Sequence, residues 1–233
     1  MARYRIADLT VQMDVSGRTK QQAEPYLTEQ DGPADILISL DRESFLVRFP
    51  ELKDLNTAEY MGTGVLFATE VLRFDGFQFH ASAVMLEGKA YLFSASPGTG
   101  KSTHTEKWCR LFGAQIINDD KPVLRRVNGG WIVYGTPWSG KHDLSSPIGV
   151  PLGGIAFLER GDRNAISRIS AVEAVPAMIS QCVRFLYKDC VSRQLELIDL
   201  LLRETPVWRL VCRNDDEAAI VSCEAMKCNG SGE

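Results

Sequence analysis

The sequence lacks several patterns that each mark a class of protein. Its 233 residues include six cysteines but no C-x-x-C pair, and no charged-then-apolar segment opens the chain. Cys223 and Cys228 have no histidine nearby, which argues against a zinc–thiolate site. We therefore expect unpaired thiols in a reducing, cytoplasmic setting.

Long apolar runs and a basic face are missing too. The longest apolar run, residues 150–158, is interrupted by Pro151 and two glycines and is far shorter than a bilayer span. Lysine and arginine are scattered along a chain whose net charge is −4, which does not suit binding to a nucleic-acid backbone. Neither a membrane span nor a nucleic-acid partner is expected.

One segment points to a specific chemistry. Residues 95–103 read Ala-Ser-Pro-Gly-Thr-Gly-Lys-Ser-Thr, which is a phosphate-binding loop of the A/G-x-x-x-x-G-K-S/T form. The apolar residues 90–94 before it predict a buried strand, and the Gly- and Pro-free residues 102–112 after it predict a helix. Average residue usage gives this pattern by chance about 0.02 times in a chain of this length. The motif in its strand–loop–helix context therefore predicts nucleotide binding.

The residue types in the loop suit negative charge. Gly98 and Gly100 allow successive N–H groups to point into one concavity, Lys101 places an ammonium against the β and γ phosphates, and Ser102 offers a hydroxyl to Mg²⁺. The positive end of the following helix adds to the field. Ala95 stands where glycine is more usual, so it should have a negative φ. The residues predicted to bind the nucleotide are Ala95, Ser96, Pro97, Gly98, Thr99, Gly100, Lys101, Ser102 and Thr103.

A pair of carboxylates follows the next predicted strand. Asp119 and Asp120 come after the β-prone residues 114–118, and Asp119 lies 119 − 101 = 18 positions after Lys101. This spacing completes a βαβ unit and brings the carboxylates to the sheet edge where ligands bind. Phosphoryl transfer uses a carboxylate that organises the metal and a second that accepts the proton of the acceptor hydroxyl. The alternative is an ordinary Asp-Asp turn before Lys-Pro.

Periodicity and turn residues place the remaining elements. Strands are expected at residues 4–13, 36–40, 45–49, 78–85, 89–94, 114–118, 122–127, 131–134, 154–159 and 207–212. Helices are expected at residues 57–73, 102–112, 172–187, 191–203 and 215–226. Two tight turns, Glu87-Gly88 and Asn128-Gly129-Gly130, join neighbouring strands into hairpins. His80 falls on the first strand of the hairpin that leads into the loop.

The chain is predicted to form one α/β domain, because its 45% hydrophobic content suffices for a core and no internal repeat divides it. We expect an N-terminal flanking layer at 1–76, a nucleotide-binding core at 77–160, a C-terminal helical segment at 161–226 and a disordered tail at 227–233. The polar loop 135–147 is a candidate substrate gate. Within it, Trp138 is either an aromatic platform for a substrate, which we favour, or a plug that packs on the core.

Three segments, residues 79–84, 92–103 and 117–120, together resemble the catalytic domain of HPr kinase/phosphorylase. Its superfamily includes the ATP-dependent phosphoenolpyruvate carboxykinases. Residues 135–141 and 158–160 look like the compact HPr kinase-like proteins found with peptide-modification genes. The resemblance covers roughly residues 78–160 and implies a P-loop kinase core in which helices flank a mixed sheet.

The resemblance also implies roles for individual residues. Asp119 would be the general base, Lys101 and Ser102 would handle phosphate and Mg²⁺, and Asp120 would support the metal. His80 would lie near the transferred phosphate. Lys141 and Arg160 would be cations that neutralise phosphate or bind the acceptor, or else solvated surface charges.

The chain departs from the family in three respects. It has no room for the separate N-terminal domain of full-length HPr kinases, Thr103 replaces an acidic residue that often follows the loop serine, and the downstream phosphorylase signature is missing. HPr itself is therefore not implied as the substrate.

The function predicted from the sequence is an ATP- and Mg²⁺-dependent kinase that phosphorylates a Ser or Thr hydroxyl of a protein, a peptide or a small molecule. The alternative is a nucleotide-dependent binding module, in which ATP orders the loop 135–147 over a partner. A GTPase is disfavoured because the Asn-Lys-x-Asp signature is absent. Whether the chain forms a homo-oligomer is left open.

Overall fold

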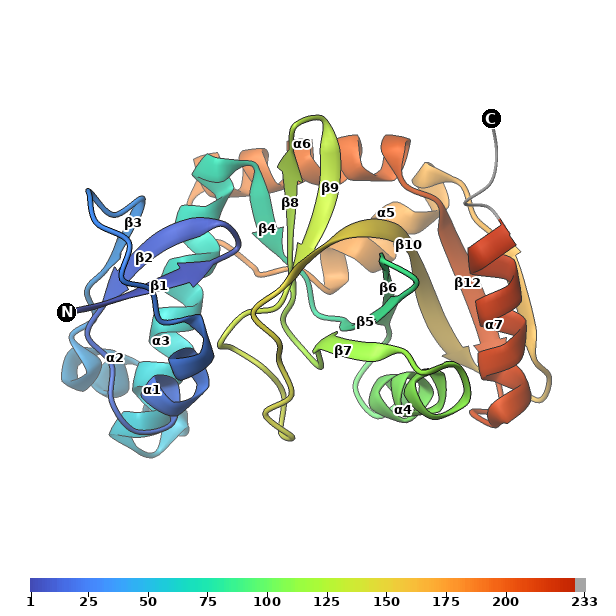
Figure 1. The fold of residues 1–233 in the computed structure, drawn as a ribbon, viewed down its shortest axis with the longest axis horizontal. Coiled ribbons are helices and arrows are strands. Elements are labelled where there is room, and N and C mark those ends of the chain that lie inside the picture. The colour runs from blue at the N-terminus through green and yellow to red at the C-terminus, as the bar shows by residue number, and fades with distance from the viewer. Residues whose placement is uncertain (229–233) are drawn as a thin grey trace.

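The computed structural model describes residues 1–228, which form two β-sheets with helices packed around them (Figure 1). The smaller sheet lies at the N-terminal end of the elongated molecule, in the strand order β1-β2-β3. Its strands are β1 (Ala2–Ile6), β2 (Leu9–Met13) and β3 (Ile36–Ile38). Helices α1 (Gly17–Ala23), α2 (Arg42–Arg48) and α3 (Leu55–Glu70) pack beside it. Together these elements form the N-terminal layer.

Two predictions for this layer are wrong. The strand expected at residues 4–13 is a hairpin, because Ala7 and Asp8 adopt left-handed conformations with φ of 52° and 59° and reverse the chain. The strand expected at residues 45–49 lies mostly in α2. The side chain of Asp41 accepts hydrogen bonds from the backbone N–H groups of Glu43 and Ser44, and this N-cap outweighs the β-propensity of the residues that follow.

The larger sheet is mixed and curled, with the order β4-β8-β9-β10-β6-β5-β7; in addition, β12 pairs with β10, and β11 pairs with β12. Its described strands are β4 (Gly76–Gln78), β5 (Ser82–Leu86), β6 (Lys89–Ser94), β7 (Gln115–Asn118), β8 (Val123–Val127), β9 (Gly130–Tyr134), β10 (Gly149–Arg160), β11 (Ala165–Arg168) and β12 (Val207–Cys212). β10 is longer than predicted and connects two parts of this sheet. Residues 149–151 pair with β9, and residues from Leu152 onward pair with β6, with a register shift between Leu152 and Gly154. Residues from Ile155 onward also pair with β12.

The strand–loop–helix prediction is confirmed at the level of secondary structure. β5 and β6 form the expected hairpin, α4 (Lys101–Phe112) follows the loop, and Gly113 ends α4 in a left-handed conformation with φ of 70°. β7 and β6 are both antiparallel to β5, so they are parallel to each other with β5 between them. Because parallel strands end at the same sheet edge, the loop after β6 and the acid pair after β7 share that edge.

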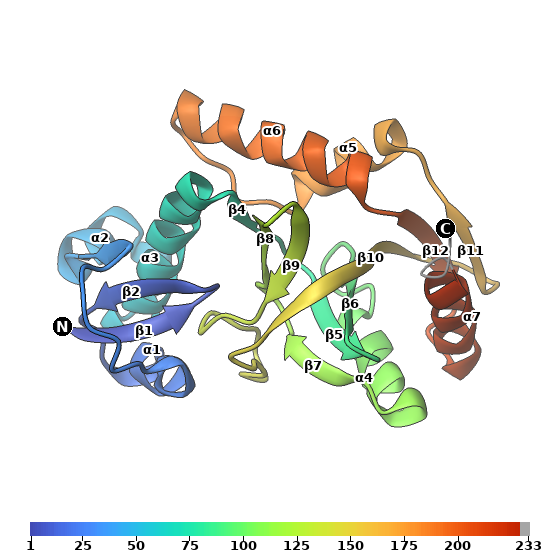
Figure 2. The ribbon, with the colours of Figure 1, turned by 45° about the horizontal axis from the view of Figure 1, so that its top comes forward.

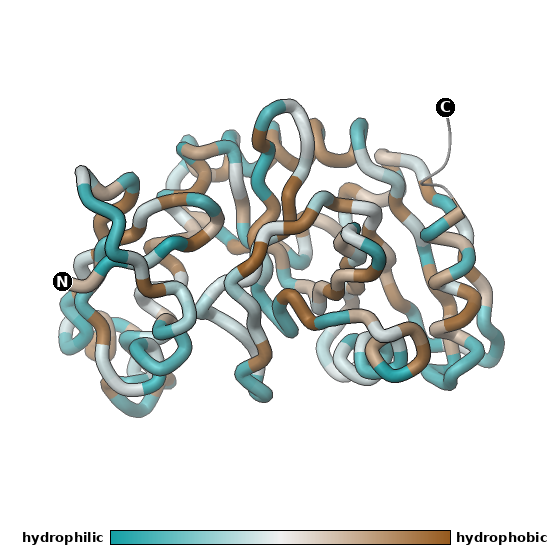
Figure 3. Tube along the Cα trace, viewed as in Figure 1, coloured by the Kyte–Doolittle hydropathy of each residue, from teal (hydrophilic) through white to brown (hydrophobic). Residues whose placement is uncertain are grey.

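Helices cover both faces of the larger sheet. On one face, α5 (Ala171–Ser180) and α6 (Lys188–Glu204) pack against an apolar cluster that includes Leu92. On the other face, α4 and α7 (Asp216–Cys228) pack against a second cluster, which includes Phe93. Leu92 and Phe93 are neighbours on β6 that face opposite sides, as period-two alternation requires. α6 spans the top of the molecule in Figure 1, and Figure 2 shows it from another side. In Figure 3 hydrophobic residues gather on the central strands and hydrophilic ones on outer turns.

The C-terminal predictions need three corrections. The helix expected at 172–187 ends at Ser180, and residues 181–187 form an irregular link to α6. The segment 161–226 contains β11, which was not predicted, as well as helices and the strand expected at residues 207–212, which is confirmed as β12. Of the tail expected to be disordered, residues 227 and 228 belong to α7, and residues 229–233 lie outside the described part. Within residues 1–228, no helix combines the length and apolar character needed to cross a bilayer.

A buried histidine joins α4 to α7. His104 Nε2 lies 3.0 Å from Ser222 Oγ, which also accepts a hydrogen bond from Trp108 Nε1 at 3.0 Å. The Phe93 ring packs 4.6 Å from the imidazole, and His104 Nδ1 is buried without a hydrogen-bond partner in the described part of the chain. Burial, and secondarily the charge of Lys107, lowers the pKa of His104 to about 4.

We predict that acid destabilises the protein through His104. The unfolded chain takes up the proton near pH 6.5 and the folded one only near pH 4, so stability is full above 6.5 and falls as the pH drops toward 4. The loss should reach about 3 kcal/mol of unfolding free energy. Urea denaturation at several pH values should show a weaker pH dependence for His104→Gln than for the wild type. His142→Gln, which removes an exposed imidazole, is the matched control. Equal pH dependence of the wild type and His104→Gln would contradict the assignment.

Candidate functional site

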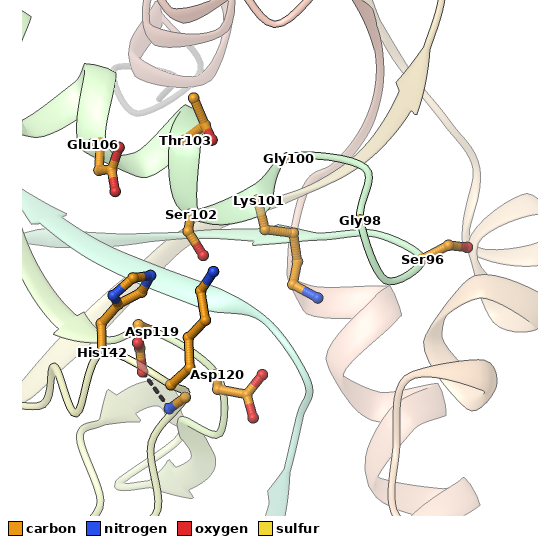
Figure 4. A pocket seen from close by; sticks show the side chains of 12 residues that line it. Ser96, Gly98, Gly100, Lys101, Ser102, Thr103, Glu106, Asp119, Asp120 and His142 are labelled. Carbon is orange, nitrogen blue, oxygen red and sulfur yellow. Dashed lines mark hydrogen bonds between the residues drawn. The ribbon is translucent and has the colours of Figure 1, made fainter.

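A cleft of about 480 Å³ lies where the loop after β6 meets the acid pair after β7 (Figure 4). In Figure 4 Lys101 and Ser102 lie on one wall of this cleft, and Asp119, Asp120 and His142 lie on the facing wall. The lining residues are Ser96, Gly98, Gly100, Lys101, Ser102, Thr103, Glu106, Asp119, Asp120, Gly140, Lys141 and His142. The structure thus brings together the loop, the lysine and both aspartates that the sequence singles out.

The loop conformation depends on its two glycines. Gly98 and Gly100 have φ of 78° and 113°, a region that side chains rarely adopt, and Gly100 is the N-cap of α4. The backbone N–H of Thr99 donates to the carbonyl of Ser96 at 3.2 Å and closes the turn. Ala95 has no left-handed conformation, as predicted, and is buried. Pro97, which was also predicted to bind the nucleotide, lies within this turn.

Lys101, His80 and Asp120 form a connected polar group. Lys101 Nζ lies 2.9 Å from His80 Nε2 and donates to the Ala95 carbonyl at 3.3 Å, while His80 Nε2 lies 3.0 Å from Asp120 Oδ1. Burial lowers the pKa of Lys101, against the opposing charge of Asp120. Burial acts to raise the pKa of Asp120, but the hydrogen bond and charge of His80, with Lys121 and Lys101, outweigh it and lower that pKa. Asp120 therefore stays ionised beside the lysine.

His80 does not lie on a strand, which corrects the expectation of one strand over residues 78–85. It occupies the break between β4 and β5, because β4 pairs with β8 whereas β5 pairs with β6. Its ring Nδ1 lies 2.8 Å from Gln181 Oε1, and its backbone N–H donates to the Gln181 carbonyl at 2.8 Å. The link after α5 thus sets the orientation of His80.

Asp119 differs from its neighbour in its surroundings. Only 7% of Asp119 is exposed, and its Oδ1 accepts a hydrogen bond from the backbone N–H of Gly140 at 2.5 Å. Burial raises the pKa of Asp119, the Gly140 hydrogen bond opposes this, and the charge of Asp120 adds to the rise. The two carboxylates thus have pKa values shifted in opposite directions, an arrangement in which one carboxylate accepts a proton more readily than the other.

The amide of Asn118 connects the acid pair to the loop 135–147. Its Oδ1 accepts from the backbone N–H groups of Asp120 and Lys121 at 2.9 and 2.6 Å. Its Nδ2 donates to the carbonyls of Thr136 and Trp138 at 3.1 and 3.2 Å. Asn118 has no exposed surface, so all of these bonds form away from water.

Trp138 is a core residue, which corrects its assignment as an aromatic platform. It has no exposed surface, stacks on Phe67 of α3 with ring centroids 4.8 Å apart, and donates from Nε1 to Thr63 Oγ1 at 3.2 Å. This position agrees with the alternative interpretation, in which Trp138 packs on the core. A substrate in the cleft cannot reach the Trp138 ring in this conformation.

The N-terminal layer supports the rest of that loop. The Tyr60 hydroxyl accepts from the backbone N–H of Ser139 at 2.6 Å, and Arg18 donates to the Gly140 carbonyl at 3.0 Å and to Asp143 at 2.6 Å. The Arg18 guanidinium also lies 4.2 Å above the Tyr60 ring centroid. The layer therefore positions Gly140 and, through it, Asp119.

The two predicted substrate cations lie in different places. Lys141 is exposed and lines the cleft. Arg160 lies outside the cleft lining and donates to the Gly98 carbonyl at 2.6 Å, so it contacts the loop from the end of β10.

Several site neighbours were not predicted from the sequence: Arg18, Glu106, Asn118, His142, Gln181 and Asn214. Arg18, Gln181 and Asn214 are far from the motifs in sequence, so no local pattern marks them. Asn118 immediately precedes the acid pair, and its turn-forming character is the one local signal.

No protein-family model matches the chain, and no curated protein matches it either. Among solved structures, 32 chains match, and one of them is the Hpr(Ser) kinase/phosphatase from Coxiella burnetii. That structure is 10% identical, and the match covers 66% of this chain and 99% of the other with a TM-score of 0.40.

We predict that Asn118→Ala destabilises the protein by about 2–4 kcal/mol, because it leaves buried backbone groups without partners. Urea denaturation measures this change. Gln115→Ala, at the exposed start of the same strand, is the control and should stay within about 0.5 kcal/mol of the wild type. A loss for Asn118→Ala no larger than that of the control would contradict the role of the amide.

Proposed function

We propose that the protein is a Mg²⁺-dependent phosphotransferase that moves the terminal phosphate of ATP to a hydroxyl of a protein, a peptide or a small molecule. One observation carries this proposal: a single cleft contains the loop 96–103, Lys101 and both carboxylates of the acid pair. The donor and acceptor halves of a phosphoryl transfer need these groups within one site.

The loop wall suits the polyphosphate. Its left-handed glycines Gly98 and Gly100 line the cleft, the N-terminus of α4 adds positive potential, and Lys101 adds an ammonium. Adenine as the base follows from the resemblance to HPr kinases. The cytoplasmic setting and the absence of a nucleic-acid partner stay predictions from composition.

The oxygen donors in the cleft fit Mg²⁺. Ser102 and the ionised Asp120 line it together, and Mg²⁺ in such sites takes one or two protein oxygens with phosphate oxygens and water. When bound, the metal would neutralise charge on the transferred phosphate. His80 would orient Asp120 and Lys101, which it contacts.

Asp119 is the proposed base. The acceptor hydroxyl transfers its proton to the carboxylate, its oxygen bonds to the terminal phosphorus, and the bond from that phosphorus to the bridging oxygen breaks to release ADP. The Gly140 hydrogen bond orients the carboxylate, and the exposed Lys141 lies at the cleft where an acceptor enters.

The contact between Asp119 and Gly140 also supports the second candidate, a nucleotide-dependent binding module. A nucleotide that displaced Asp119 would release the N–H of Gly140 and so alter the loop 135–147. In such a protein, partner binding would change with ATP and no phosphate would be transferred.

We predict that Asp119→Asn lowers turnover by roughly 10²–10⁴-fold because the amide cannot accept the proton, while its oxygen can still accept from Gly140. Transfer of labelled phosphate from ATP to candidate acceptors measures turnover, and calorimetry measures Mg²⁺–ATP binding, which should persist. Asp162→Asn, an exposed carboxylate outside the cleft, is the matched control. Undiminished turnover in Asp119→Asn would remove Asp119 as the base. Tight ATP binding without transfer in the wild type would favour the binding module.

The pH profile gives an independent prediction. Only ionised Asp119 accepts a proton, and its raised pKa means that activity is lost at higher pH than for an ordinary aspartate of pKa 3.8. The acid limb of kcat/KM should therefore titrate above pH 3.8. A profile that stays flat down to that pH would contradict the assignment.

A further inference from the structure

A second cavity adjoins the loop on the side away from the acid pair. It measures about 380 Å³ and is lined by Arg160, Gly161, Cys212, Arg213 and Asn214. β10 is parallel to both β6 and β12, so the ends of β10 and β12 lie at the same sheet edge as the loop. β5 and β7 lie on the opposite side of β6. The loop therefore separates this cavity from Asp119 and Asp120.

Two contacts attach the cavity wall to the loop. Arg160 Nη2 donates to the Gly98 carbonyl at 2.6 Å. A Cβ atom at Gly100 would lie 2.4 Å from Nδ2 of Asn214, so this amide packs directly against the glycine. Asn214 Oδ1 is buried without a hydrogen-bond partner within residues 1–228, which leaves the amide with unused hydrogen-bonding capacity. A ligand that fills the loop thus lies within reach of this wall.

The acid pair sets the direction of a bound nucleotide. If the terminal phosphorus faces Asp119 and Asp120, the nucleoside must leave at the other end of the phosphate chain. In Figure 4 Thr103 lies on the side of Ser102 away from both aspartates. α4 continues from Thr103 to Arg110, which pairs with Asp216 at the start of α7. The route away from the acid pair therefore leads toward residues 212–214.

Arg213 has the chemistry to hold a planar ring there. Its Nε pairs with Asp215 at 3.3 Å and its Nη2 with Glu217 at 2.9 Å, while 51% of the side chain stays exposed. The two carboxylates fix the guanidinium and offset its charge, which favours an uncharged aromatic ring over a further phosphate.

We propose that this cavity binds the nucleoside of a nucleoside triphosphate and that its base stacks on Arg213. The inference rests on the proposed function and adds a site for the nucleoside of the phosphate donor. Stacking on a guanidinium contributes to affinity for any base and nothing to affinity for a bare polyphosphate. This difference gives the test.

Titration calorimetry of the full chain with Mg²⁺–ATP and with Mg²⁺–tripolyphosphate separates the two parts of the ligand. We expect Arg213→Ala to weaken ATP binding roughly five- to tenfold and to leave tripolyphosphate binding unchanged. Arg213→Lys keeps the charge without the planar group and should weaken ATP binding to a smaller extent. Arg209→Ala, on β12 shortly before Arg213 and paired with Glu159, is the matched control and should bind both probes like the wild type. Thermal unfolding verifies that each variant is folded.

The outcomes distinguish the two proposals. If the wild type binds both probes and Arg213→Ala changes neither affinity, or changes both equally, the nucleoside site is wrong and the proposed function stands. If the wild type binds neither probe, the proposed function fails and this inference with it.

Discussion

The organisation of the site depends on hydrogen bonds made by one buried amide. Asn118 ends β7, and its Oδ1 accepts from the backbone of Asp120 and Lys121 while its Nδ2 donates to the loop 135–147. An asparagine side chain offers both an acceptor and donors, so it satisfies two backbone segments at once. Because these bonds are buried, leaving any of them unmade is costly. The turn that carries the acid pair and the loop beside it therefore form one unit.

The sheet supplies the second constraint. β6 and β7 run parallel with β5 between them, and β10 and β12 continue the parallel set on the other side of β6. Parallel strands place their carboxyl ends at a common edge, where neighbouring chain segments diverge and leave space. Both cavities next to the loop lie at this edge, one beside the acid pair and one beside Arg213. Because the two cavities lie on opposite sides of the loop, the proposed nucleotide has its terminal phosphate toward the acid pair and its nucleoside toward Arg213.

The N-terminal layer takes part in the site although it contributes no residue to the cleft lining. Phe67 packs on Trp138, Tyr60 bonds to Ser139, and Arg18 bonds to Gly140. These contacts fix the backbone N–H that reaches Asp119. Burial raises the pKa of Asp119, and the hydrogen bond from Gly140 opposes that rise. The pKa of Asp119 therefore depends on the packing of the N-terminal layer, which is distant in sequence.

The sequence by itself determined the features that depend on local chemistry. Left-handed glycines set the loop and the end of α4, and Asn128 with Gly129 sets the β8–β9 hairpin, because only a few residue types adopt these conformations without strain. The roles proposed for Lys101 and the acid pair also came from local motifs, and the structure brings these residues into one cleft. Only the tertiary structure decided that His80 stands in a strand break facing Gln181 and that Trp138 is buried. Each of these outcomes depends on contacts between residues far apart in the chain, whose energies no local pattern encodes.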